Sequence, residues 1–86
     1  MNQTQSEVTR IISEVLEIAP AEVRPELSIR SLPNVESIRI LNVILKVEKA
    51  FNIELPDDAT FRIETVSEFV ALVEEARSLQ TPAAVG

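Results

Sequence analysis

Residues 33–51 read PNVESIRILNVILKVEKAF, a turn followed by a helix that together decide the fold. Pro33 and Asn34 are residue types that favour turns. Ser37 is among the residues whose side-chain oxygen best accepts a hydrogen bond from the free N–H groups of a first helical turn. Glu36 adds negative charge near the positive end of the helix dipole. One interpretation of Ser37 is therefore a helix N-cap and nothing more.

The helix that follows has an unusually wide apolar surface. At about 100° per residue, the residues expected to face the core are Ile40, Val43, Ile44, Val47 and Phe51. A second apolar set, on the flank nearer Ser37, consists of Ile38, Leu41 and Leu45. Polar residues lie roughly opposite the core face: Arg39, Asn42, Lys46 and Lys49. This surface exceeds what one face of a surface helix requires, so either part of it is left for a partner or a small bundle buries the helix on two sides.

Composition excludes several classes of function. The 86 residues form one domain, expected at 1–80 with a flexible tail at 81–86. With no cysteine and no histidine, the chain lacks a thiolate nucleophile, a zinc-thiolate site and the commonest general base. A net charge of −6 argues against nucleic acid or an anionic membrane as the main partner. No apolar run approaches the roughly 20 residues of a membrane span, and there is no signal-peptide pattern, so we expect a cytoplasmic, monomeric, non-enzymatic protein.

Three further helices are expected. The first begins at the capping-box spacing Thr4-Gln5-Ser6-Glu7 and ends near Ala19-Pro20, with an apolar stripe at Val8, Ile11, Ile12, Val15 and Ala19. A short third helix starts at Asp57-Asp58 and runs through Ala59 and Phe61, its acidic pair being helix-start charge and not a metal site. The last begins at a second capping box, Thr65-Val66-Ser67-Glu68, and carries Val66, Phe69, Val70, Val73 and Ala76.

The first two helices are joined by a long loop with three prolines, residues 20–36. Val23, Leu27, Ile29 and Leu32 are spaced through it, so we expect it to pack across the bundle. No strand alternation is visible, and the sum is an all-α four-helix bundle with a long first loop and a short third helix.

This order of parts resembles the acyl carrier and peptidyl carrier protein family. The similarity covers about Val8 to Ala76 and is most specific over Ser31-Leu32, Glu36-Ser37-Ile38 and the stretch from Val47 to Pro56. In that family the serine of an Asp-Ser-Leu or Asp-Ser-Ile motif carries phosphopantetheine through a phosphodiester. The resemblance implies that Ser37 is that serine, with Glu36 as its motif neighbour, and that the arm's thiol holds an acyl or aminoacyl group as a thioester.

The resemblance also implies a set of partners: a phosphopantetheinyl transferase, a loading ligase for acyl or aminoacyl groups, and downstream synthases or transferases. We place their docking surface at Ile38, Leu41 and Leu45, with Arg39, Lys46 and Lys49 tuning partner choice through charge. An unmodified helical interaction module, with Ser37 as a structural N-cap, is the alternative.

Three departures from the family pattern shape these expectations. Glu36 stands where the family usually has Asp, and Asn34 replaces the usual Gly, although Asn tolerates the left-handed backbone that such a Gly supplies. Fatty-acid carriers usually have a strongly acidic second helix, whereas Arg39, Lys46 and Lys49 here outnumber Glu36 and Glu48. A specialised polyketide, nonribosomal peptide or modified lipid pathway therefore fits better than general fatty-acid synthesis.

Overall fold

The computed structural model describes residues 3–56, 58 and 63–80. The helices are α1 at Gln3–Leu16, α2 at Ser37–Phe51 and α4 at Val66–Gln80, with two short 3-10 helices, η1 at Pro20–Glu22 and η2 at Ile29–Ser31. The expected all-α fold is confirmed: across the described residues there is no strand, only an isolated bridge between Ser28 and Thr65. Apart from Asp58, the third helix expected at Asp57 to Phe61 lies outside the described residues, as does the tail at 81–86.

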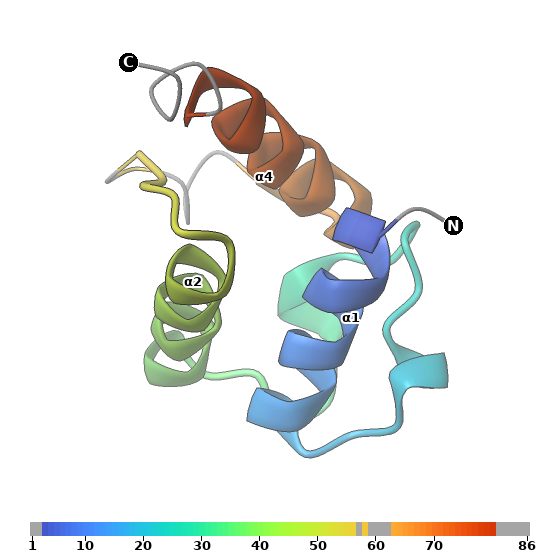
Figure 1. Ribbon diagram of the computed structural model, residues 1–86. Helices are drawn as coiled ribbons and strands as arrows, with labels where there is room; N and C mark the ends of the chain where they lie inside the picture. The colour runs from blue at the N-terminus through green and yellow to red at the C-terminus, as the bar shows by residue number, and fades with distance from the viewer. Residues whose placement is uncertain (1–2, 57, 59–62, 81–86) are drawn as a thin grey trace.

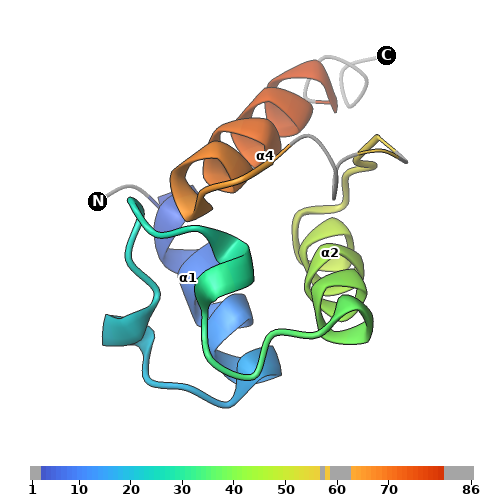
Figure 2. The ribbon, with the colours of Figure 1, turned by 180° about the vertical axis from the view of Figure 1, so that it is seen from behind.

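The helices pack around α1. Figure 1 shows α1 and α2 running in opposite directions, so that the start of α2 lies near the end of α1, while α4 crosses one end of the pair. The view from behind shows that the loop after α1 runs along the side of α1 that faces away from α2 and then returns through η2 to the start of α2 (Figure 2). No helix within the described part of the chain combines the length and apolar character that a membrane span needs.

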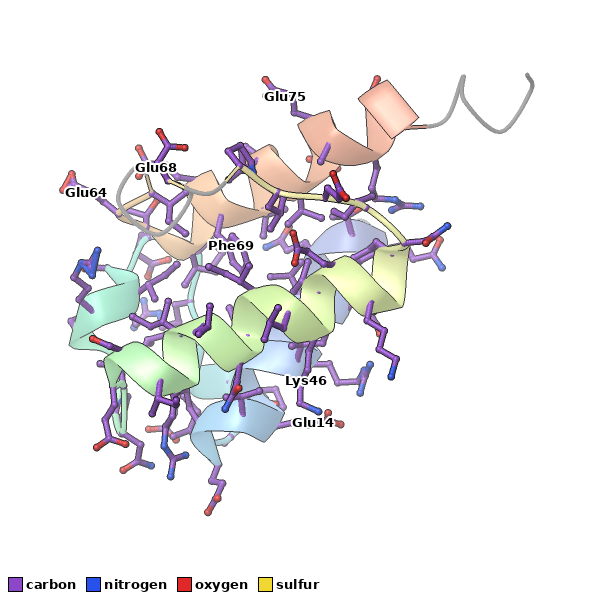
Figure 3. All side chains as sticks on the ribbon, turned by 90° about the vertical axis from the view of Figure 1, so that its left-hand side faces the viewer. Glu14, Lys46, Glu64, Glu68, Phe69 and Glu75 are labelled. Carbon is purple, nitrogen blue, oxygen red and sulfur yellow. The ribbon has the colours of Figure 1, made fainter. Side chains whose placement is uncertain are left out.

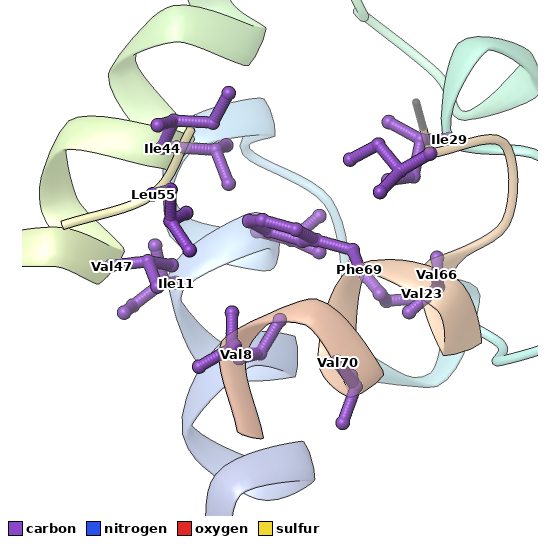
Figure 4. Close-up of a cluster of buried hydrophobic side chains, with 14 of the residues drawn as sticks. Val8, Ile11, Val23, Ile29, Ile44, Val47, Leu55, Val66, Phe69 and Val70 are labelled. Atoms are coloured by element: carbon purple, nitrogen blue, oxygen red, sulfur yellow. The ribbon is translucent and has the colours of Figure 1, made fainter. Parts of the chain in front are cut away.

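The core is built from the predicted apolar stripes. The buried residues confirmed from those stripes are Val8, Ile11, Ile12, Val43, Ile44, Val47, Val66, Phe69, Val70, Val73 and Ala76. Figure 4 shows the Phe69 ring reaching across the core toward Ile44 and Leu55. Phe51 is only partly buried, and the Arg77 guanidinium lies over its ring at 4.8 Å from the centroid. Phe51 was predicted on the core face, but among the described residues Phe69 is the fully buried aromatic residue. The loss of stability from removing a core aromatic ring is therefore expected at Phe69.

The two ends of α1 differ from the sequence-based expectation. The helix ends at Leu16, not near Ala19, because Glu17 adopts a left-handed conformation (φ 58°) and the Ile18 amide donates to the Ser13 carbonyl at 3.0 Å. A hydrogen bond from an amide to the carbonyl five residues earlier is characteristic of the Schellman motif, which ends many helices. At the other end, Thr4 lies inside α1 and is buried, so its assignment as a cap was wrong.

The long loop packs across the bundle as expected. Val23, Ile29 and Leu32 are buried. Three backbone hydrogen bonds fasten the loop to the segment that starts α4: Ile29 N–H to Glu64 O at 2.8 Å, Val66 N–H to Leu27 O at 3.0 Å, and Ser67 N–H to Pro25 O at 2.9 Å. The loop is thus held against α4, and its last residues deliver the chain to the start of α2.

The start of α4 is the capping box that the sequence predicts. The Glu68 amide donates to Thr65 Oγ1 at 3.1 Å, and Glu68 Oε1 accepts the amides of Thr65 at 3.1 Å and Glu64 at 2.8 Å. The hydrogen bonds from the Thr65 and Glu64 amides favour the charged carboxylate and lower the pKa of Glu68 below its ordinary 4.5. Glu64 and Glu68 lie together at this end of α4 (Figure 3).

Candidate functional site

Ser37 is the first residue of α2 and not its cap. The N-cap is Glu36, whose backbone is extended (φ −139°, ψ 157°) and whose carbonyl accepts the Ile40 amide at 2.9 Å. No side chain among the described residues caps this helix end with a hydrogen bond. The interpretation of Ser37 as an N-cap was therefore wrong, because the preceding residue makes the transition into the helix.

The Ser37 side chain is available for chemistry. The residue is exposed, and its hydroxyl has no hydrogen-bond partner among the residues that the structure describes. The first amides of a helix lack intrahelical acceptors and favour negative charge beside them. A phosphodiester on Ser37 Oγ would thus be solvent-accessible and close to a favourable dipole.

Asn34 forms the turn that leads to Ser37. Its backbone is left-handed (φ 64°), which confirms that Asn supplies the conformation for which a glycine is usually needed. Its side chain makes a further contact that glycine could not, since Nδ2 donates to the Leu16 carbonyl of α1 at 2.8 Å. The turn position was visible in the sequence, but this contact across 18 residues was not.

Arg39 is directed toward the end of α1. Its Nη1 donates to the Val15 carbonyl at 2.8 Å and lies 4.0 Å from Glu17 Oε2, while Nε donates to Glu36 Oε1 at 3.3 Å. The side chain is only 31% exposed. The sequence placed Arg39 with the docking charges. Its i, i+3 spacing from Glu36 predicts the contact with that carboxylate, but nothing in the sequence predicts the contact with α1.

The second apolar set on α2 is exposed. Ile38, Leu41 and Leu45, which we call the exposed stripe, have 64%, 49% and 53% of their surface accessible. Of the two interpretations of the wide apolar surface, burial on two sides of a bundle is wrong for these residues. They form an uncovered row of side chains that begins directly after Ser37.

Basic residues lie on another side of α2, along a shallow groove shared with α1. The groove encloses about 220 Å³ and is lined by Arg10, Ile11, Glu14, Lys46, Lys49 and Ala50. Figure 3 shows Lys46 on this side together with Glu14. Arg10 pairs with Glu7 and with Glu14, and its hydrogen bond lowers the pKa of Glu7. Lys46 and Lys49 form no ion pair with any described residue, so their charges face solvent.

A small apolar cavity lies behind the Ser37 turn. It has a volume of about 20 Å³ and is lined by residues that include Val35, Ile40 and Phe69. This volume is close to that of a single water molecule. In this conformation the cavity offers no room for an extended apolar chain.

Comparison with known proteins agrees with this geometry. Residues 6–73 match the family model described as "Phosphopantetheine attachment site", a segment that contains the Ser37 turn and all of α2. The chain is also 33% identical over 75 residues to the acyl carrier protein of Amoebophilus asiaticus (strain 5a2), a match that covers 87% of this chain and 94% of that protein. The chain belongs to the acyl carrier protein family. Phosphopantetheine is the cofactor of this family, and its members are carriers that interact with synthases and with a phosphopantetheinyl transferase.

Proposed function

We propose that this acyl carrier protein becomes functional when phosphopantetheine is attached to Ser37 Oγ, and that it then carries acyl or aminoacyl groups as thioesters on the arm. The supporting observation is the Ser37 hydroxyl itself, which is exposed, has no hydrogen-bond partner in the described structure and lies in the family-matched segment at the first turn of α2. The arm supplies the thiol that a chain without cysteine lacks.

The attachment reaction is a phosphoryl-group transfer from coenzyme A. The Ser37 Oγ–P bond forms as the pyrophosphate P–O bond breaks, adenosine 3′,5′-bisphosphate leaves, and the hydroxyl proton passes to a base outside this chain. Because no hydrogen bond in the described structure holds the Ser37 hydroxyl, the reaction breaks no hydrogen bond among the described residues. Glu36 is the acidic neighbour of the motif, and its carboxylate is held by Arg39.

The exposed stripe is the proposed docking surface for the modifying and downstream enzymes. Ile38, Leu41 and Leu45 offer an apolar contact next to the attachment point. Lys46 and Lys49 add two positive charges on the same helix, so we expect partners with acidic residues beside an apolar cleft. A carrier must release each enzyme after its step, which suits a small docking surface of this kind.

The basic residues of α2 also support the finer assignment to a pathway. We propose a specialised polyketide, nonribosomal peptide or modified lipid pathway, since Lys46 and Lys49 give α2 a basic side where a fatty-acid carrier is usually acidic. The cofactor arm, in this proposal, presents its cargo outside the bundle, because the cavity behind the Ser37 turn encloses only about 20 Å³.

The deciding experiment is the intact mass of the protein expressed with a broad-specificity phosphopantetheinyl transferase. The wild-type chain should gain the mass of one phosphopantetheine, and Ser37→Ala should gain none. Ser31→Ala is the matched control, because Ser31 is an exposed serine of the same loop whose hydroxyl donates to the Ser28 carbonyl at 2.7 Å.

Two results would contradict the proposal. Mass gain by Ser37→Ala would move the attachment site to another residue. No gain by the wild-type chain with several transferases would instead support an unmodified interaction module that uses the exposed stripe alone.

A further inference from the structure

The turn that carries Ser37 has few contacts of its own. The Glu36 carbonyl accepts the Ile40 amide of α2, but no backbone hydrogen bond joins residues 33–36 to α1, to α4 or to the rest of the loop in the described structure. The Val35 side chain packs against the core, but the residues on either side of it are exposed. Ser37 follows this segment directly as the first residue of α2, so side chains that fix the turn also help to fix the position of its hydroxyl.

Two side-chain donors provide that fixation, one on each side of Ser37. Asn34, three residues before Ser37, donates to Leu16 O at 2.8 Å, and Arg39, two residues after it, donates to Val15 O at 2.8 Å. Both acceptors are successive carbonyls at the C-terminal end of α1.

These two carbonyls are available because of how α1 ends. The last carbonyls of a helix have no intrahelical donor. The Ile18 amide closes the end by bonding to Ser13 O, which leaves Val15 O and Leu16 O to accept from elsewhere. The negative end of the helix dipole and the carboxylate of Glu17, at 4.0 Å, favour a guanidinium at this position.

We propose that Asn34 and Arg39 form a clamp that positions Ser37 for modification, which deepens the proposed function and rests on it. Transfer requires Ser37 Oγ in line with the breaking P–O bond, and a displacement of about 1 Å in such a geometry can cost about 100-fold in rate. The clamp fixes both ends of the Ser37 turn to α1 before the transferase binds. Arg39 is thus a positioning residue and not a docking charge.

The test uses variants that remove the donors while keeping shape. Arg39→Met keeps the aliphatic stem and loses the guanidinium, and Asn34→Asp keeps a short side chain that tolerates a left-handed backbone but cannot donate. Arg24→Met is the control, since Arg24 is an exposed arginine that pairs with Glu26 and its loss makes the same change in net charge.

The first measurement is the kinetics of phosphopantetheine transfer from coenzyme A. We expect kcat to fall about 10-fold in Arg39→Met and in Asn34→Asp, with KM for the carrier within about twofold of wild type, because the docking stripe is unchanged and only the alignment of the hydroxyl is lost. Arg39→Lys, which retains one donor group, should recover part of the loss. A rise in KM at constant kcat that disappears at high salt would overturn the clamp and make Arg39 a docking charge.

The second measurement does not depend on modification. Backbone ¹⁵N order parameters at residues 35–38 should be about 0.85 in the wild-type chain and fall toward 0.6 when both donors are removed. Unchanged order parameters in a folded double variant would overturn the clamp even if the wild-type chain is loaded. Failure of the wild-type chain to be loaded would overturn the proposed function, and the positioning role with it.

Discussion

Helices α2 and α4 each contain 15 residues, yet their first turns differ. The start of α4 uses Thr65 and Glu68 to satisfy its free amides. Among the described residues no side chain caps the start of α2, although Ser37 is a residue type that could provide a cap. The first turn of α2 therefore leaves the Ser37 hydroxyl unbonded among the described residues, as the proposed attachment site requires.

The same contrast holds for apolar residues in the two first turns. Phe69 of α4 is 1% exposed, whereas Ile38 of α2 is 64% exposed. Phe69→Ala should lower the free energy of unfolding by about 3–5 kcal/mol, the cost of a cavity in a packed core. Ile38→Ala should change it by less than about 0.5 kcal/mol. Urea denaturation of both variants measures the two effects.

Ile38→Ala should nevertheless weaken function. If the exposed stripe is a docking surface, kcat/KM for phosphopantetheine transfer should fall roughly 5- to 10-fold, which corresponds to about 1 kcal/mol of lost docking free energy. Equal losses of stability in Phe69→Ala and Ile38→Ala would break the comparison, and so would wild-type kinetics in Ile38→Ala.

A smaller effect distinguishes the two hydroxyls. Thr65→Ala should cost about 0.5–2 kcal/mol, because the Glu68 amide loses its acceptor. Ser37→Ala should cost less than about 0.5 kcal/mol, because Ser37 caps nothing in the described structure. Thermal unfolding of the two unmodified variants checks this, and a larger loss for Ser37→Ala would restore the interpretation of Ser37 as a cap.

The sequence predicted the parts of this molecule that depend on short-range patterns. The core stripes of α2 and α4, the second capping box and the left-handed turn at Asn34 each follow from residue type and spacing. The end of α1 was placed too late because the apolar spacing continues to Ala19, while the helix is closed by a left-handed Glu17, a residue type that rarely adopts this conformation.

The contacts that join distant segments could not be read in the same way. Asn34 and Arg39 reach the end of α1 across 18 and 24 residues, and neither contact leaves a periodic signal. The exposure of Ile38, Leu41 and Leu45 was equally undecided, because periodicity gives the width of an apolar surface and not what covers it. The exposed apolar surface and the contacts between distant segments are therefore identified only from the three-dimensional structure.

The smallest expected effect concerns pH, and it tests the charged half of the α4 cap. The pKa of Glu68 is lower in the folded state than in the unfolded chain, so the unfolded chain binds more protons as the pH falls through the carboxyl range. This contribution to stability is present above the ordinary pKa of 4.5 and is lost as the pH falls through the folded-state pKa. Glu68→Gln should show a shallower loss of stability in acid, because glutamine can still accept hydrogen bonds from the backbone amides but does not titrate.

Glu75→Gln is the matched control for this titration, since Glu75 is an exposed carboxylate on the same helix and points away from the bundle (Figure 3). Unfolding free energies of the three proteins between about pH 3 and pH 6 make the comparison, with Glu75→Gln expected to follow the wild type. If Glu68→Gln follows it as well, the carboxylate adds nothing beyond a neutral acceptor. The contrast between the two helix starts would then depend on the Thr65 hydroxyl alone.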